Sequence, residues 1–413
     1  MFHSDRDIGV LWAPGERRRG RTVLRNYLLN HAYYYQPYMQ RRHFLQHALA
    51  APFVVPGWGS GPPRAYHEEL AMLMRAAPVP GAVIGMVRNF EVAWIVPIGV
   101  QAAGNGDKVS GTTLFHAASL TKQATAHAAL ALCAQQKLDL DRPLVSWVDD
   151  LPDAPARSVT VRHVLSHSSG FCNWRSAEPG KPLPALIPAF APGSRYSYSG
   201  EGYFYLQRVL EQITGLGIGQ VVQELVFEPL RMKSTTLVWD PRTLAQTALP
   251  HDRHGEARTG WDKSARALHA WGERNGKAVG QLRYEDYAAA TREAGDPVLP
   301  NWMQPNGAAS MVTHAEDYAR FLTGALRNPE IAKQQIAINE FLGWGLGWAI
   351  ERSSGHTYVW QWGDNPGFKN VVFADRSTGS AVFVFTNGDA GARVYDRVVT
   401  HATGHDHPAL FWL

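Results

Sequence analysis

A serine and a lysine lie three residues apart at the start of an alanine-rich run, in the segment HAASLTK at residues 116–122. Residues at positions i and i+3 of a helix share one face, with Cβ atoms about 5–6 Å apart. The Ser119 hydroxyl and the Lys122 amine can therefore share a pocket as a nucleophile and its proton acceptor. A nucleophile at a helix start also gains from the helix dipole and from backbone N–H groups that can face an oxyanion.

Two other segments place polar groups in turns. Tyr198 lies in a loop rich in Ser and Gly, PGSRYSYSGEGY, just before an amphipathic helical pattern. Gly363 ends a strand-like run before an Asp-Asn-Pro-Gly turn in VWQWGDNPGFKN. Taken singly, the first segment is equally consistent with a loop anchored by the Tyr198 hydroxyl, and the second with an ordinary hairpin turn.

In this order, the three segments resemble the motifs of the serine β-lactamase and penicillin-binding family, particularly class C β-lactamases and related esterases. The resemblance covers about residues 78–388 and extends to LVSWVDDLP, VTVRHVLSHSSGF, FEPLRMKSTTL and GAASMVTHAEDYARFL. It implies that Ser119 is the nucleophile of an acyl-enzyme, and that Lys122 and Tyr198 share the proton transfers. It also implies that the N–H groups of Ser119 and Asp364 hold the oxyanion.

The proton acceptors of this scheme need lowered pKa values. Free Lys and Tyr side chains both titrate near pH 10 or above, roughly three units from neutrality. A partly buried Lys pressed against Tyr is expected to supply the shift that proton transfer at neutral pH requires.

Two positions depart from the family pattern. The second motif commonly reads Tyr-x-Asn, but this chain has Gly200 at its third position, and the third motif commonly begins with a cation, but Gln361 stands there. The missing amide and cation favour a neutral ester over a β-lactam or a peptide, with Trp362 and Gly363 beside the substrate. A β-lactamase or D-amino-acid peptidase, and a binding or sensor module that is acylated without turnover, stay open as alternatives. We expect no cofactor.

The elements that position these residues follow from hydrophobic patterning. A strand hairpin is expected over residues 80–100, a helix over 120–138 and further strands over 343–351, 357–363, 370–376 and 380–388. Helical pieces fill the region between. The sequence thus predicts an α+β fold, β-lactamase/transpeptidase-like by the resemblance. Its antiparallel sheet, flanked by helices, would come from about 66–138 and 301–413, with a helical insertion at about 139–300.

The amino-terminal region resembles an export signal. Arg41 and Arg42 precede Phe44, Leu45 and a short apolar run, as in a twin-arginine signal. That run is too short for a membrane anchor, which needs roughly 20 apolar residues. We therefore assign 1–38 to an upstream extension that is not necessarily native, 39–65 to signal and linker, and 66–413 to the catalytic domain. The predicted location is the periplasm, with the cytoplasm as the alternative.

Composition excludes other classes of protein. Residues 1–65 carry nine Arg against three acidic residues, a net charge of +6. Because the whole chain carries +4, residues 66–413 carry −2. The sequence of this larger part therefore predicts no basic nucleic-acid surface. Cys133 and Cys172 are interpreted as buried apolar residues, with a single disulfide left open. His167 lacks a G-x-S-x-G partner for a Ser-His-Asp triad. Four other histidines lack a carboxylate set at metal-binding spacing, namely His251, His254, His405 and His407. The expected partner is a small ester or amide substrate.

Overall fold

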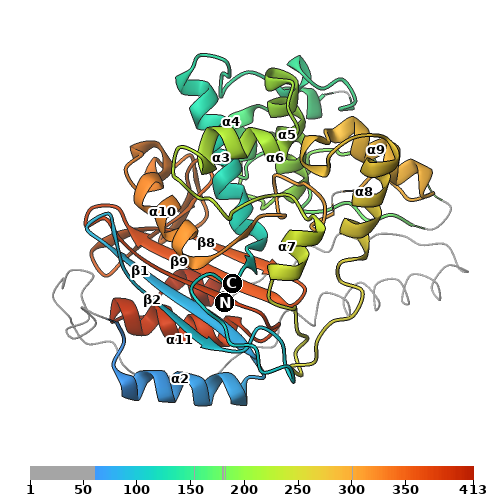
Figure 1. The fold of residues 1–413 in the computed structure, drawn as a ribbon. Helices are drawn as coiled ribbons and strands as arrows, with labels where there is room; N and C mark the ends of the chain where they lie inside the picture. The colour runs from blue at the N-terminus through green and yellow to red at the C-terminus, as the bar shows by residue number, and fades with distance from the viewer. Residues whose placement is uncertain (1–60, 153, 179–180, 182, 300) are drawn as a thin grey trace, which may run out of the picture. The chain divides into compact units, whose positions relative to one another are not determined.

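The computed structural model describes residues 61–413, apart from 153, 179–180, 182 and 300. Its centre is an eight-stranded sheet in the order β2-β1-β10-β9-β8-β7-β6-β5, in which every neighbouring pair is antiparallel (Figure 1). The strands are β1 (Gly81–Arg88), β2 (Glu91–Gly99), β5 (Ile336–Ala337), β6 (Leu342–Trp344), β7 (Ala349–Ser353), β8 (His356–Asn365), β9 (Phe368–Asp375) and β10 (Ser380–Thr386). A separate small sheet pairs β3 (Phe115–His116) with β4 (Val312–Thr313).

Alternation along the strands builds a separate core on each face of the main sheet. In β10, Phe383 and Phe385 pack into one core, whereas Val382 and Val384 pack into the other. Side chains at successive strand positions point to opposite faces, so both sets are buried only if helices cover both faces. Because both of its faces are buried, β10 is apolar along most of its length and does not alternate between apolar and polar residues.

Helices cover both faces of the sheet, as Figure 1 shows. On one face lie α2 (Arg64–Ala76), α11 (Ala392–Thr403) and α12 (Pro408–Trp412). The other face carries the 3₁₀ turn η1 (Ala118–Leu120), α3 (Thr121–Ala134) and α10 (Ala315–Ala325), with the helical region stacked above them. That region contains α4 (Val161–Leu165), α5 (Gly200–Thr214), α6 (Ile218–Val222), α7 (Pro241–Gln246), α8 (Lys263–Arg274) and α9 (Tyr284–Glu293). The predicted class, an antiparallel sheet flanked by helices, is confirmed.

One predicted strand is two strands. Residues 343–351 form β6 and β7, separated by residues 345–348. Gly347 has φ +83, and a Cβ there would lie 2.2 Å from Ala126 Cβ on α3. The chain therefore turns where it passes against the helix that carries Lys122, which only glycine allows.

The expectation that both cysteines are buried is wrong. Cys133 is half-buried and Cys172 is exposed, and both thiols are free. The loop is held at Cys172 through its backbone, because Cys172 O accepts from Ser199 Oγ at 2.8 Å, and the thiol side chain stays exposed.

The predicted extension at 1–38 and most of the predicted signal and linker at 39–65 lie outside the described residues. Within the described part of the chain, no helix combines the length and the apolar character needed to cross a bilayer.

Candidate active site

Ser119 lies in the tight turn η1 between β3 and α3. Ala118, the residue before it, has φ +51, a left-handed conformation that residues with a Cβ rarely adopt. The Thr121 hydroxyl holds the turn by donating to Ala118 O at 2.6 Å and accepting from Met311 N at 2.9 Å. Ser119 is half-exposed although both of its neighbours are buried. The turn therefore presents the predicted nucleophile to solvent at the start of a helix.

The Lys122 side chain is completely buried beside Ser119. Its Nζ donates to Ser119 Oγ at 3.1 Å and to Ala308 O at 2.9 Å. Three aromatic rings surround the amine, with centroids 4.9 Å (Tyr198), 5.7 Å (Trp174) and 5.7 Å (Tyr203) from Nζ. Burial penalises the charged form and lowers the pKa of Lys122 to about 7. A neutral amine is therefore available near pH 7 to take the Ser119 proton.

Tyr198 completes the predicted trio at the start of α5. Its ring is partly exposed, but its hydroxyl is buried and makes no hydrogen bond of good geometry within the described residues. Burial raises the pKa of Tyr198 above its ordinary value of 10, more than the nearby Ser119 and Gln361 side chains lower it. The expectation that Lys122 would lower this pKa is wrong, because burial of the phenol dominates. At neutral pH Tyr198 is a phenol and can donate a proton.

His167 positions Tyr198 without entering the proton chemistry. Its ring stacks on the Tyr198 ring at a centroid distance of 4.1 Å, and its Nδ1 accepts from Ser199 N at 3.0 Å. Burial, reinforced by the charge of Lys122, keeps the pKa of His167 well below its ordinary value. The His167 ring is therefore neutral, and its Nδ1 is engaged by the backbone N–H of Ser199. This agrees with the expectation that His167 is not part of a Ser-His-Asp triad.

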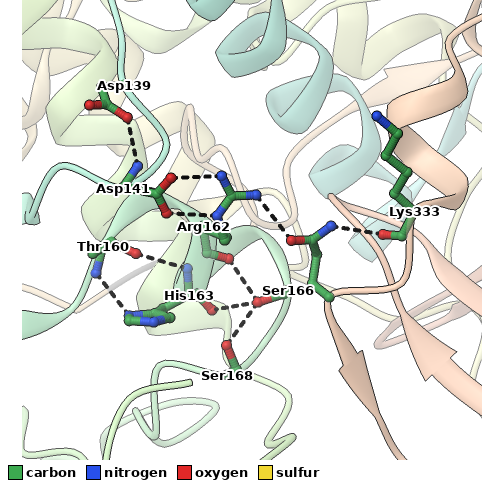
Figure 2. Close-up of polar contacts among 9 residues, drawn as sticks. Asp139, Asp141, Thr160, Arg162, His163, Ser166, Ser168 and Lys333 are labelled. Carbon is green, nitrogen blue, oxygen red and sulfur yellow. Dashed lines mark hydrogen bonds and ion pairs between the residues drawn. The ribbon is translucent and has the colours of Figure 1, made fainter. Parts of the chain in front are cut away.

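The loop that carries His167 is fixed by a network at α4, shown in Figure 2. Arg162 donates to both carboxylate oxygens of Asp141 at 2.7 and 2.8 Å. Ser166 Oγ donates to Arg162 O at 2.7 Å and shares a hydrogen bond with Ser168 Oγ at 2.8 Å. These contacts hold the backbone on both sides of His167, which has φ +52.

The end of β8 is pressed against the nucleophile turn. A Cβ at Gly363 would lie 2.4 Å from Ala117 O and 3.2 Å from Ala118 Cβ, so a side chain at this position would push the two segments apart. The glycine of the third motif is therefore required by close approach rather than by its φ.

The register of the same hairpin turns the Asp364 N–H away from β9. Asn365 and Phe368 close the turn between β8 and β9, and Asp364 faces Lys369 in the next pair. Hydrogen-bonded and non-bonded pairs alternate in an antiparallel ladder, and the pair that closes a two-residue loop is bonded. The Asp364 N–H thus points away from β9, as the predicted oxyanion role requires.

Gln361 and Trp362 occupy opposite faces of β8. Gln361 is fully buried on the Ser119 side, beside Tyr198, and its Nε2 has no hydrogen-bond partner in the described part of the chain. Trp362 is half-buried, stacks on the ring of Trp360 at 5.6 Å and packs in a tilted arrangement against the ring of Tyr198 at 4.9 Å. The third motif therefore contributes a neutral carboxamide to the site, whereas Trp362 supports the far side of Tyr198.

Gly200, at the first position of α5, faces a residue that the sequence analysis missed. A Cβ at Gly200 would lie 2.1 Å from the Trp174 ring. Trp174 is 40% exposed and its ring faces the Lys122 amine. No periodicity marks Trp174 in the sequence; its only signal is its place four residues after the SHSSG segment.

The arrangement contains the parts that acyl transfer needs. It combines a hydroxyl beside a neutral amine, a phenol, and two N–H groups at the meeting point of a helix start and a strand end. Among the described residues, no three His, Cys, Asp or Glu side chains are grouped so as to hold a metal ion.

Comparison with known proteins places the chain among relatives with this arrangement of elements. Residues 69–404 match the family model described as Beta-lactamase. The chain is 27% identical over 362 residues to esterase EstB of Burkholderia gladioli, covering 76% of this chain and 87% of the relative. It is 24% identical over 304 residues to penicillin-binding protein 4 of Amycolatopsis lactamdurans, covering 69% and 74%. The solved structure of EstCE1, a hydrolase with promiscuous acyltransferase activity, shares the fold with a TM-score of 0.62 at 18% identity, covering 82% of this chain and 98% of that one.

Proposed function

The chain belongs to the beta-lactamase family, a family of serine hydrolases, and from this premise we propose that it is an esterase. Its substrates are neutral acyl esters, which it hydrolyses through an acyl-serine intermediate at Ser119. The observation that carries the ester preference is the uncharged side chain of Gln361, buried beside Tyr198. An anionic substrate such as a β-lactam carboxylate or a D-alanyl terminus gains no ion pair there.

In the proposed acylation step, neutral Lys122 takes the proton of Ser119 as Oγ attacks the ester carbonyl. The N–H groups of Ser119 and Asp364 donate to the oxyanion that forms. When the intermediate collapses, the ester C–O bond breaks and the leaving alkoxide takes the phenolic proton of Tyr198. The Lys122 ammonium then returns its proton to Tyr198, so the site regains its starting protonation state.

Deacylation uses the same groups in the second half of the cycle. Water attacks the acyl-serine carbonyl and gives a proton to Lys122. The acyl–Oγ bond breaks, the Lys122 ammonium returns that proton to Ser119 Oγ, and the carboxylic acid leaves. Because Lys122 must be neutral for both steps, turnover rises with pH through about 7.

The proposal is tested by steady-state hydrolysis of p-nitrophenyl butyrate and nitrocefin with the full chain and with Ser119→Ala. We expect ester turnover that is lost in the variant, and little turnover of nitrocefin. Fast nitrocefin hydrolysis would favour the β-lactamase alternative. A single burst of p-nitrophenol that is not followed by turnover would favour the sensor alternative.

We also propose that the protein is exported through the twin-arginine pathway, on the strength of Arg41, Arg42 and the apolar run after them. Residues 39–65 fused to a reporter should direct it to the periplasm of a bacterial host. Replacing both arginines with lysine should retain the reporter in the cytoplasm. Equal export of the two fusions would contradict the proposal.

A further inference from the structure

The backbone on either side of Trp174 is held by hydrogen bonds that join Asn173 and Arg175 to the start of α5. Asn173 O accepts from Gly200 N at 3.1 Å and from Glu201 N at 2.9 Å, and Asn173 Oδ1 also accepts from Gly200 N at 2.9 Å. On the other side, Arg175 reaches the fully buried Glu201 carboxylate through its backbone N–H at 3.0 Å and its Nε at 3.1 Å. The backbone on both sides of Trp174 is thus fixed, which fixes where the indole emerges.

The indole is seated on a glycine. The three ring atoms nearest to a Cβ built at Gly200 would be 2.1, 2.2 and 2.6 Å from it, so any side chain there would collide with the benzo edge of the ring. The Tyr-x-Asn pattern would put an amide at this position. In this chain Trp174 can occupy its position only because residue 200 has no side chain, since the indole and a side chain at 200 would fill the same space.

The indole also borders the reacting groups. Its centroid is 5.7 Å from Lys122 Nζ, which itself lies 3.1 Å from Ser119 Oγ. Trp174 keeps 40% of its surface exposed, so part of the indole is open to solvent although the neighbouring Lys122 is buried. The ring centroid of Tyr198, the proposed proton donor to the leaving alcohol, lies 4.9 Å from the same Nζ, and Trp362 packs tilted against that ring from behind. The alcohol of a bound ester must lie beside the Tyr198 hydroxyl that protonates it, which leaves the Trp174 side of the amine to the acyl group.

We propose that Trp174, seated on Gly200, forms the wall of the acyl pocket and selects esters of flat, apolar acyl groups, such as aroyl esters. This inference rests on the proposed esterase function and names its substrate class. A rigid indole offers a flat apolar face for stacking, whereas an amide at this position would offer polar contacts to an amide-bearing acyl chain.

The test compares two esters with the same leaving group, p-nitrophenyl benzoate and p-nitrophenyl acetate. The readout is the ratio of their kcat/KM values, benzoate over acetate, in the wild type and in four variants. Loss of the indole in Trp174→Ala should lower this ratio about tenfold, the effect of losing one stacked aromatic contact and its buried area. Trp174→Phe keeps a ring and should stay within about threefold of the wild type.

Gly200→Ala provides a second, independent perturbation, because its new methyl group displaces an indole that is still present. It should lower the ratio as Trp174→Ala does. Phe341→Ala removes an aromatic side chain of similar exposure, 44%, outside the site and should leave the ratio unchanged. A ratio that stays within twofold of the wild type in both Trp174→Ala and Gly200→Ala would overturn the inference.

Failure of the proposed function gives a different result. If the wild type forms an acyl-enzyme without turnover, the same ratio is measured from the burst rates of p-nitrophenol, and it still tests Trp174. If neither ester acylates Ser119, as read by intact mass, both the esterase proposal and the inference are refuted.

Discussion

Replacing Lys122 with Met tests the burial of the amine on which the proposed chemistry depends. Folding lowers the pKa of this group from its ordinary 10.5 to about 7, so the unfolded chain binds its proton more tightly than the folded chain. Each pH unit of that difference corresponds to about 1.4 kcal/mol. Burying this lysine, charged at pH 6 and deprotonated at pH 9, therefore costs the folded protein about 5 kcal/mol at pH 6 and about 2 kcal/mol at pH 9.

The sign follows from proton linkage. Because the unfolded state binds more protons between pH 7 and 10.5, this contribution to stability rises with pH over that range. Methionine fills a similar volume without a charge, so Lys122→Met should gain most in stability, relative to the wild type, at low pH. Loss of the hydrogen bond to Ala308 O affects both pH values alike and cancels in the comparison.

The measurement is urea unfolding of wild type and Lys122→Met at pH 6 and pH 9. The free energy of unfolding of the variant minus that of the wild type should fall by about 3 kcal/mol from pH 6 to pH 9. Lys137→Met, at an exposed position just after α3, is the matched control and should show no such change. A difference for Lys122→Met that is constant to within about 1 kcal/mol would refute a depressed pKa, and with it the role of Lys122 as the base.

Three further changes probe the site and its support. Tyr198→Phe should lower kcat by about 10²-fold or more, the usual scale for a lost acid or base, while an effect below about tenfold would assign the proton transfers to Lys122 alone. Gly363→Ala brings a methyl group to within 2.4 Å of Ala117 O; ester hydrolysis should fall at least about tenfold as the oxyanion donors separate, and unchanged kcat would refute the close-approach argument. Burial raises the pKa of Glu211 from 4.5 to about 7 although three N–H groups donate to it, so this carboxyl stabilises the fold at low pH and loses that effect as pH rises through 7. Relative to the wild type, Glu211→Gln should therefore gain about 3 kcal/mol in free energy of unfolding between pH 5 and pH 8, whereas a constant difference would contradict the raised pKa.

Sequence reasoning predicted Ser119 and Lys122 from local spacing, whereas the roles of Tyr198 and Asp364 came from the family resemblance. Ser119 and Lys122 are in contact because one helical turn separates them, and the Asp364 N–H points away from β9 because a two-residue turn fixes the ladder pattern. The hairpin of β1 and β2 and the buried strand β10 were equally predictable, since their apolar runs are short and bounded by turn residues. Each of these features needs only the residues within about ten positions.

The parts that could not be predicted depend on contacts between distant segments. Trp174 itself lies in a stretch without helical or strand periodicity. It reaches the site because Asn173 and Arg175 bond to Gly200 and Glu201, about 26 positions later at the start of α5. The full burial of Lys122 is also nonlocal, because it requires the carbonyl of Ala308, 186 residues away. Sequence spacing predicts that the Lys122 amine contacts the Ser119 hydroxyl, but it does not predict how completely water is excluded from the amine.

The neutral residue at position 361 fits the separation of pKa values seen between the two proton carriers. A cation there, beside the Tyr198 hydroxyl, would favour the phenolate and disfavour the charged form of Lys122, and would move the role of base toward the tyrosine. With Gln361 in that place, burial is the largest effect on both groups: it lowers the pKa of Lys122 to about 7 and raises that of Tyr198. Two groups whose pKa values are driven apart in this way divide the work, one as base and the other as acid. The loss of the cation thus weakens recognition of anionic substrates while leaving a complete apparatus for proton transfer to a neutral ester.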